Sequence, residues 1–337
     1  MAQDNETLLS IVGRNIDRVT TVEMRISDYS RGVIANLHAA AVSAQGGGPL
    51  SMLGARKMID NIKPGRSVIL TTGAGDPRFL PAGETDGPPG LVVLARAVAA
   101  LGGVPILLTE APFIDNVRAT AIAIGLGVRD ADMAPSVPWS CAILPVSADN
   151  DASRQAEDYL TRFDPTLLVS IEKLGPNPEG IAHTASGKPT ADGRGRAEHL
   201  FDLAASRGLP TLGIGDNGNE IGFGLILDAV RKFKPAGDRL GTRVATDVLV
   251  PANTSNWGGY GVVAAMAAIL ERPDLLHTPE DEERLIRACV DANGVDGSTG
   301  RHILQVDGMS MAVNCGLVAM LNGIVRASLV KGFKRPF

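Results

Sequence analysis

The sequence lacks the features that mark several large classes of protein. Aromatic residues make up only 4% of the chain, and the three cysteines form no C-x-x-C pair, so neither a disulfide framework nor a cysteine zinc site is expected. A formal net charge of -5 does not favour phosphate neutralisation, so we expect no nucleic-acid partner. No apolar run approaches the roughly 20 residues that span a bilayer, so we expect no membrane partner.

The amino terminus also lacks a recognisable targeting signal. Its first residues, MAQDNETLL, are acidic and contain no apolar core of the kind that a signal peptide carries. This composition predicts a cytoplasmic protein with reduced cysteines. At 337 residues the chain is long enough to bury a sizeable core, and its 39 glycines indicate many tight turns.

Short β-branched runs alternate with segments of helical periodicity along most of the chain. Strands are expected at 67–72, 104–109, 141–145, 166–171, 210–214 and 244–250, and helices at 91–101, 117–126, 152–163, 196–207 and 220–233. Apolar strands joined by helices form parallel sheets covered on both faces. The pattern predicts an α/β fold, a Rossmann-like three-layer sandwich. We expect one domain over 1–337, with a mainly helical cap at 1–61 and further helices at the carboxyl end.

Acidic and amide side chains follow the expected strands. Ligands of open parallel sheets bind beyond the carboxyl ends of the strands, so these side chains share one rim. Carboxylates gathered there repel one another unless protons or a cation lie between them. Oxygen ligands suit Mg²⁺, Mn²⁺ or Ca²⁺, and no zinc spacing such as H-E-x-x-H occurs, so Mg²⁺ or Mn²⁺ is predicted first. The rim residues are Glu84, Asp86, Glu110, Glu172, Asp216, Glu220 and 253–256.

The segment GIGDNGNE at 213–220 has three interpretations. Its letters match G-x-G-x-x-G, but Asp216 and Glu220 would face a pyrophosphate and the motif follows the fifth expected strand, so no nucleotide cofactor is expected. Asp216 could instead cap the next helix, with Glu220 complementing its dipole. A cap requires neither Asn219 nor the flanking glycines, and the i to i+4 spacing lets both carboxylates converge on one ion. Metal or substrate binding is therefore favoured.

Three further motifs each have a structural and a functional interpretation. Glu84 and Asp86, in GETDGPPG, fit a solvated turn or a pair that binds a cation or divides acid and base roles. Ser255 and Asn256 fit a helix cap or, with exposed helix N–H groups, a site for a substrate carboxylate. Asp296, in DGSTG, fits a turn first and a substrate contact second. No G-x-S-x-G elbow or P-loop occurs, so a hydrolase triad and a nucleoside triphosphate site lack their signatures.

Together these motifs resemble the D-glutamate cyclase-like C-terminal domain family. The resemblance extends from about residue 31 to the carboxyl-terminal helix, and the acidic glycine-rich loop is its most specific part. Asn217 stands where the family has glycine, and Asn tolerates left-handed backbone angles. The family favours an aromatic residue after the first strand, where this chain has Ala74. The matching segments, in family order, are GETDGP at 83–88, LARA at 94–97, IEKLG at 171–175, IGDNGNEIGFG at 214–224 and SNWG at 255–258.

The resemblance implies a lyase that converts D-glutamate to 5-oxo-D-proline and water, or catalyses the reverse ring opening. A bound Mn²⁺ or Mg²⁺ would polarise a carboxyl group, and a carboxylate would accept the ammonium proton. Two alternatives stay open: a metal-dependent hydrolase such as a phosphatase, and a non-catalytic module that binds a metabolite. A homo-oligomer is also open. The implied roles are metal ligands Asp216, Glu220 and Glu172, a base that is Glu84 or Asp86, and contacts to a small acidic amino-acid-like substrate from Asn219, Ser255, Asn256 and Asp296.

Overall fold

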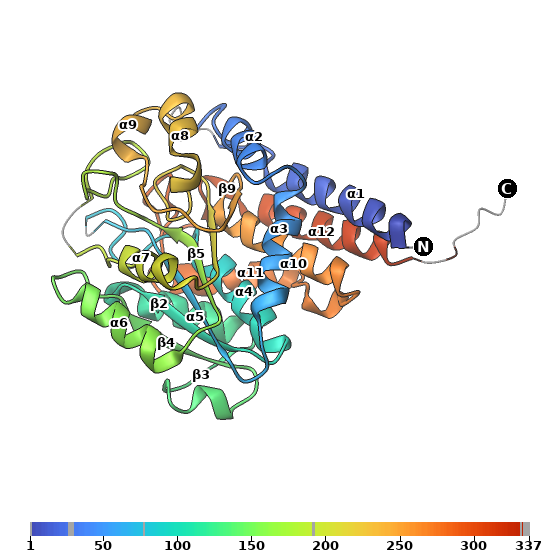
Figure 1. Ribbon diagram of the computed structural model, residues 1–337, viewed down its shortest axis with the longest axis horizontal. Coiled ribbons are helices and arrows are strands. Elements are labelled where there is room, and N and C mark those ends of the chain that lie inside the picture. The colour runs from blue at the N-terminus through green and yellow to red at the C-terminus, as the bar shows by residue number, and fades with distance from the viewer. Residues whose placement is uncertain (1, 26–29, 77, 191–192, 331, 333–337) are drawn as a thin grey trace.

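A parallel sheet of seven strands forms the centre of the part of the chain that the structure describes. The computed structural model describes residues 2–25, 30–76, 78–190, 193–330 and 332. The strand order is β3-β4-β2-β1-β5-β6-β7, and each neighbouring pair is parallel. Helices cover both faces of this sheet (Figure 1), which confirms the predicted α/β fold.

The elements follow the alternation that the sequence predicts. The strands are β1 (Ser67–Gly73), β2 (Val104–Thr109), β3 (Gly127–Val128), β4 (Ser140–Pro145), β5 (Leu167–Lys173), β6 (Thr211–Gly215) and β7 (Val248–Pro251), with a separate antiparallel hairpin of β8 (Gln305–Val306) and β9 (Met309–Ser310). The α-helices are α1 (Ala2–Thr20), α2 (Ile34–Ala44), α3 (Leu50–Asn61), α4 (Pro88–Ala100), α5 (Ile114–Ala123), α6 (Ala152–Phe163), α7 (Glu198–Arg207), α8 (Leu227–Phe233), α9 (Gly237–Leu240), α10 (Ser255–Ile269), α11 (Pro279–Asp291) and α12 (Met311–Ser328).

Two apolar cores lie on the two faces of the sheet because side chains alternate along each strand. Val68 and Leu70 of β1 pack into the core that α3, α4 and α10 complete, whereas Ile69 packs into the core formed with α6 and α7. Helix α10 packs most extensively among the helices on its face of the sheet, and its Trp257 and Tyr260 are both buried. These two cores fix the strand ends, and therefore the loops that leave them.

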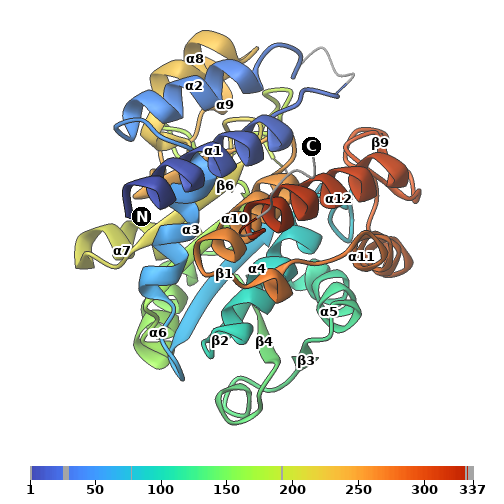
Figure 2. The same ribbon diagram turned by 90° about the vertical axis from the view of Figure 1, so that its right-hand side faces the viewer.

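The first and last helices gather around α10. Helix α12 packs against α1, α10 and α11, so the first and last helices lie on the same side (Figure 2). Helix α12 is also long and apolar enough to cross a membrane by length and composition alone. Core helices of soluble proteins meet the same test, so this is weak support for a membrane role. The single-domain assignment stays a prediction.

Two expected elements begin at least four residues later than predicted. The strand expected at 244–250 begins at Val248, and the helix expected at 220–233 begins only at Leu227, after a short 3₁₀ turn. Gly222 explains the delay of the helix, because its φ is +117° and its Cα lies against Gly213 of β6, where a side chain would find no room. The residues after β6 therefore form a loop that folds back against β6 itself.

Candidate functional site

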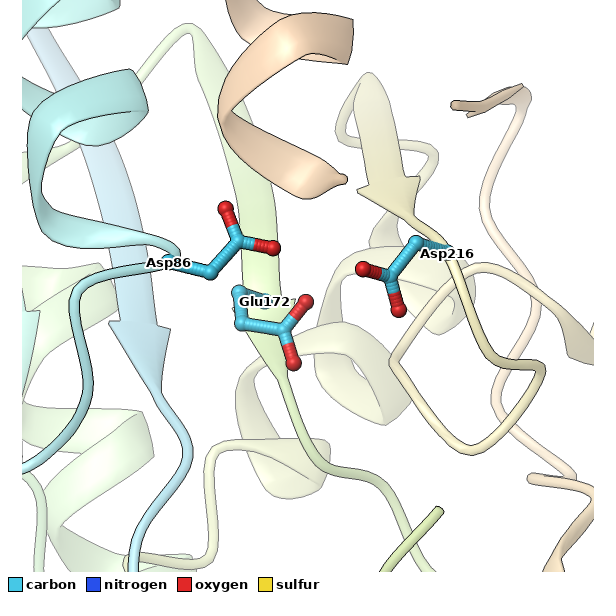
Figure 3. A group of neighbouring side chains, drawn as sticks. All are labelled: Asp86, Glu172 and Asp216. Atoms are coloured by element: carbon cyan, nitrogen blue, oxygen red, sulfur yellow. The ribbon is translucent and has the colours of Figure 1, made fainter. Parts of the chain in front are cut away.

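Three carboxyl groups meet at the carboxyl edge of the sheet. Asp86, Glu172 and Asp216 each offer an oxygen atom, and these atoms all lie within 4.8 Å of one another. Figure 3 shows the three side chains converging from the loop before α4, the end of β5 and the end of β6. Their exposed fractions are 2%, 5% and 3%, so the charges are removed from bulk water. The predicted acidic rim is thus a compact buried group.

Asp86 lies between the amino ends of two helices. It precedes α4, and the backbone N–H groups of Ser255 and Asn256, at the start of α10, donate to its two oxygens at 2.9 and 2.8 Å. These bonds and the α10 dipole favour the ionised carboxylate. Burial acts more strongly in the opposite direction and, with the nearby Asp307 charge, raises the pKa of Asp86 to about 7. Oδ1 also accepts the Gly87 N–H at 3.1 Å, so Oδ2 is the oxygen that keeps a lone pair for a further partner.

Glu172 owes its position to a bulge in β5. Thr71 of β1 pairs with Ser170, and Gly73 pairs with Lys173, so β5 has one residue more than β1 in this interval. The φ of Glu172 is +46°, a left-handed value that is uncommon outside glycine. Such strained backbone conformations cluster at functional sites, where the surrounding structure imposes them.

The bulge redirects two consecutive side chains. Ile171 packs into the core beneath α10, so a regular strand would send Glu172 to the opposite face of the sheet. Instead, the hydroxyl of Ser255, in α10, donates to the Glu172 carboxylate. Lys173 is sent the other way and contacts Glu110 at the end of β2. The bulge therefore brings Glu172 to the acidic group and removes the lysine from it.

Glu220 organises the loop that carries Asp216. Its carboxylate accepts the backbone N–H groups of Asp216 at 3.3 Å, Asn217 at 2.9 Å and Gly218 at 2.8 Å. The loop is therefore held by a side chain, and Asp216 does not cap a helix, contrary to the structural interpretation of this motif. Because the Glu220 oxygens are committed to these donors, its role as a direct metal ligand stays a prediction.

Arg25 brings a positive charge to the acidic group from the segment after α1. Its Nη2 contacts the carboxylates of Asp216 and Asp307, and its side chain is only 7% exposed. Burial lowers the pKa of Arg25, but these carboxylates raise it by more, so the guanidinium stays charged. Its Nε is buried without a hydrogen-bond partner, so one N–H remains for a ligand.

The negative charges at the site outnumber the positive ones. Lys234, after α8, donates to the Asn217 Oδ1 at 2.6 Å, and burial lowers its pKa to about 8. Burial also raises the pKa values of Glu84, Glu172 and Asp216 well above their usual range, and neighbouring carboxylates add to the shift in each case. The interacting groups are the seven acids Glu84, Asp86, Glu172, Asp216, Glu220, Asp296 and Asp307, and the two bases Arg25 and Lys234.

Glu84 borders the acidic group from the loop before α4. It is 8% exposed, and its Oε2 occupies the space where a side chain on Gly297 would be, only 2.0 Å from an ideal Cβ. The Asp307 and Asp86 charges are the neighbours that act most strongly on Glu84 after burial itself. The two carboxyl groups of the GETDGPPG segment are therefore both at the site, in different surroundings.

The four predicted substrate contacts hold local structure. Ser255 donates to Glu172, as described above. Asn256 accepts the N–H groups of Gly87 and Gly90 at 2.9 and 2.8 Å and donates one N–H to the Thr85 carbonyl, so its carbonyl oxygen is fully used. Asn219 and Asp296 are similarly engaged. Asn219 donates to the His183 carbonyl at 2.8 Å and keeps an unpartnered Oδ1, and Asp296 accepts from Thr299 and the Gly308 N–H. Their contact with substrate stays a prediction.

The donor set fits a small hard cation. A Mg²⁺ or Mn²⁺ ion with bonds of about 2.1 Å needs ligand oxygens up to about 4 Å apart, and Ca²⁺ tolerates about 5 Å. The 4.8 Å limit for Asp86, Glu172 and Asp216 is close to these dimensions. Three buried carboxyl groups also need compensation that one guanidinium does not supply in full.

Sequence reasoning did not identify Arg25 or Lys234 as part of this site. The Asp-Gly pair at 307–308 is by its sequence a turn first and a functional candidate second, and Lys234 directly follows the helix expected at 220–233. Arg25 lies 191 residues from Asp216 in the chain, and no motif surrounds it. A basic residue that faces the acidic motif could have been expected, but the sequence does not show which basic residue lies close to it in the folded chain.

The fold and this site define an α/β protein with a buried acidic centre at the carboxyl edge of its sheet. The model of the D-glutamate cyclase-like, C-terminal family matches residues 36–322. The chain belongs to that family.

Two individual proteins give further comparisons. The human mitochondrial D-glutamate cyclase is 31% identical over 211 residues, which are 60% of this chain and 32% of that protein. The chain thus spans about a third of the length of that relative. A lactate oxidase from Pediococcus acidilactici aligns over 92% of this chain and 91% of its own, with 10% identity and a TM-score of 0.21, which is too low to indicate a shared fold.

Proposed function

We propose that the chain is a metal-dependent lyase that converts D-glutamate to 5-oxo-D-proline and water, or catalyses the reverse reaction. The observation that carries the proposal is the group of three buried carboxyl oxygens within 4.8 Å, at the strand ends where α/β proteins bind ligands. Membership of the D-glutamate cyclase-like family supports the choice of reaction.

In this proposal Asp86, Glu172 and Asp216 hold the ion, and Glu220 holds the Asp216 loop. A bound Mg²⁺ or Mn²⁺ supplies Lewis acidity toward a carboxyl oxygen, which makes the carbon more electrophilic. Ser255 fixes the Glu172 carboxylate through its hydroxyl. Every one of these residues is buried, so their charged and polar groups have little contact with bulk water.

Glu84 is the proposed proton acceptor. The α-ammonium group of the substrate must lose a proton before its nitrogen can attack the γ-carboxyl carbon. The raised pKa of Glu84 makes it a stronger base than an ordinary carboxylate, which suits this transfer. The new C–N bond forms, a C–O bond breaks, and the oxygen leaves as water with two protons that came from the ammonium group. Glu84 returns the proton it accepts, so the reaction is balanced.

Arg25 is proposed to orient the substrate. An acidic substrate would be repelled by the carboxylates unless positive charge faces it. The guanidinium is fixed by Asp216 and Asp307, and its unpartnered Nε can donate to a substrate carboxylate. Arg25 would thus hold one carboxylate of a dicarboxylic amino acid.

The test is product analysis with each candidate substrate. D-glutamate, L-glutamate and both 5-oxoprolines are incubated with the protein in Mn²⁺ or Mg²⁺ and, separately, in chelator, and chiral chromatography follows the products. Stereospecific interconversion that requires the metal is expected. No turnover of any of the four would contradict the proposal, and metal binding without turnover would favour the metabolite-binding module. Release of phosphate from phosphomonoesters would favour the hydrolase.

A further inference from the structure

The side chain of Asn217 connects two charged groups at the acidic centre. Its Nδ2 donates to Oδ1 of Asp216 at 2.5 Å, and its Oδ1 accepts from the Lys234 ammonium at 2.6 Å. The Ser30 hydroxyl also donates to that amide oxygen, at 3.3 Å. Asn217 is only 8% exposed, so water has little access to these contacts. An ammonium group, an amide and a carboxylate therefore form one buried chain of hydrogen bonds.

The two neighbours leave one orientation for the Asn217 amide. An ammonium group can only donate, so the amide oxygen must face Lys234, and an ionised carboxylate can only accept, so the amide NH₂ must face Asp216. Both bonds have a charged partner, and such bonds are about twice as strong as neutral ones. The amide cannot turn over without losing both contacts.

The backbone at position 217 does not explain why an asparagine is there. Asparagine and glycine are favoured where φ is positive, but in this loop the positive φ falls on Gly218, at +94°, and Asn217 has an ordinary negative φ. Other side chains could therefore adopt the same backbone at this position. What distinguishes asparagine here is its amide, which carries a donor and an acceptor on one short side chain.

Lys234 is a fixed anchor for this chain of bonds. It directly follows α8, is 3% exposed, and donates its backbone N–H to the Val230 carbonyl at 2.9 Å. Val230 in turn packs against the loop that carries Asp216, because a Cβ on Gly218 would lie 2.7 Å from its Cγ1. The end of α8 and the loop are thus held together, and so are Lys234 and Asn217.

Asp216 needs this support because the bonds to its backbone do not fix its carboxylate. Glu220 holds the backbone of the loop, but the Asp216 side chain can still rotate. Its Oδ2 contacts Arg25 and its Oδ1 accepts from Asn217, so each oxygen has one donor and keeps a lone pair. Figure 3 shows the carboxylate turned toward the other two acids. Partners that orient a metal ligand in this way contribute about 10–100-fold to metal affinity.

We propose that Asn217 and Lys234 are positioning residues that hold the Asp216 carboxylate toward a bound metal ion. Neither contributes a ligand atom: Asn217 bonds the ligand, and Lys234 acts through Asn217. The proposal rests on the metal site of the proposed function, and it extends that site from the strand ends to the end of α8.

Calorimetric titration of the full chain with Mn²⁺ at pH 7 tests the amide. Asn217→Ala should weaken binding by about tenfold, whereas Asn150→Ala, at an exposed asparagine, should bind as the unaltered chain does. Urea denaturation of the metal-free variants accompanies the titration. A residue with a merely structural role would lower stability and leave the Mn²⁺ affinity of the folded protein unchanged, and that result would overturn the proposal.

Lys234→Met tests the second contact, and the sign of its effect decides. An ammonium group that acted directly through space would repel the cation, so its removal would strengthen Mn²⁺ binding. Because we expect it to act through Asn217, removal should weaken binding, though by less than Asn217→Ala. Lys232→Met, at an exposed lysine of α8, is the control and should change nothing. Stronger or unchanged binding in Lys234→Met would overturn the proposal, also if Asn217→Ala fails to fold.

The double variant shows whether the two residues act as one unit. Asn217→Ala with Lys234→Met should bind Mn²⁺ no more weakly than Asn217→Ala alone, because both changes break the same chain of bonds. Losses that add would mean that Lys234 acts independently of Asn217, which contradicts the proposal.

The unaltered chain separates this proposal from the lyase proposal. Saturable Mn²⁺ binding that Asn217→Ala leaves unchanged would refute the positioning role alone. Absent Mn²⁺ binding in the unaltered chain would refute the metal site of the proposed function and the positioning role with it. Mn²⁺ binding that depends on Asn217, without turnover of D-glutamate, L-glutamate or either 5-oxoproline, would support the positioning role and refute the lyase.

Discussion

Glu172 and Lys173 are neighbours in β5, yet they enter opposite electrostatic surroundings. Lys173 meets Glu110, so one buried positive charge faces one buried negative charge. Glu172 meets Asp86 and Asp216, and the guanidinium of Arg25 is held by Asp216 and Asp307. The first arrangement balances its charge with its own residues, whereas the second carries an excess of negative charge.

The difference indicates which side of the strand needs an external partner. Moving a charge out of water is costly, and a protein can keep it only with a counter-charge, a proton or a bound ion. The Lys173–Glu110 pair already has its counter-charge and needs neither a proton nor a bound ion. The acidic centre, by contrast, must take up protons or a cation, so chemistry that depends on an ion is expected there.

The largest effect should follow removal of a proposed metal ligand. Asp216→Asn keeps the size of the side chain and removes its charge, so affinity for Mn²⁺ should fall on the order of 100-fold or more, since even the outer partners of metal ligands contribute 10–100-fold. Calorimetric titration with Mn²⁺ measures this change. Asp228→Asn, at a carboxylate that is 99% exposed, is the matched control and should bind as the unaltered chain does. Equal affinity in both variants would remove Asp216 from the ligand set.

Breaking the Lys173–Glu110 pair should lower the stability of the fold. Glu110→Gln leaves the Lys173 ammonium buried without its counter-charge, and breaking a buried pair in this way costs about 3–5 kcal/mol of unfolding free energy. Urea denaturation measures the loss. The double variant Glu110→Gln with Lys173→Met should recover a large part of it, because no unpaired charge remains. A single variant as stable as the unaltered chain would show that the two charges do not depend on each other.

The contrast between the two sides also marks the limit of sequence reasoning. The alternating strands and helices predicted the α/β class, and the positions of Asp86, Glu172 and Asp216 after strands predicted that they share an edge. The sequence does not show the extra residue that β5 inserts against β1, because that bulge depends on the pairing of two strands. By simple alternation Glu172 would face away from α10.

The loop after β6 illustrates a second limit. Apolar spacing predicted a helix from Glu220, but the Glu220 carboxylate holds three backbone N–H groups of its own loop, and the helix begins at Leu227. These hydrogen bonds and the close approach of Gly222 to β6 outweigh the local helix propensity of this segment. Arg25 was missed for a different reason, since only the folded chain brings it to Asp216.

The excess negative charge should make stability depend on pH when metal is absent. The pKa of Asp86 is raised from near 4 to about 7, so the folded chain binds this proton more tightly than the unfolded chain. The stabilisation is complete below about pH 4 and is lost as pH rises through 7, by an amount on the order of a few kcal/mol. Thermal unfolding in chelator between pH 5 and 8 measures the fall, and added Mn²⁺ should oppose it most at pH 8, where protons compete least with the ion for the carboxylates. A chelated protein that is more stable at pH 8 than at pH 5 would contradict this account.

The smallest expected effect is a gain in stability on the Glu172 side of β5, opposite in sign to the loss expected on the Lys173 side. Glu172→Gln removes one charge from a group of like charges, so in chelator at pH 8 the variant should be more stable than the unaltered chain, by about 1 kcal/mol. The gain should be smaller at pH 5, because burial and the neighbouring acids raise the pKa of Glu172, so its carboxyl group takes up a proton more readily than an ordinary glutamate as the pH falls. Urea denaturation at the two pH values measures both. A loss of stability like that of Glu110→Gln would mean that Ser255 and the bulge already satisfy Glu172, and the acidic centre would then need no ion at that position.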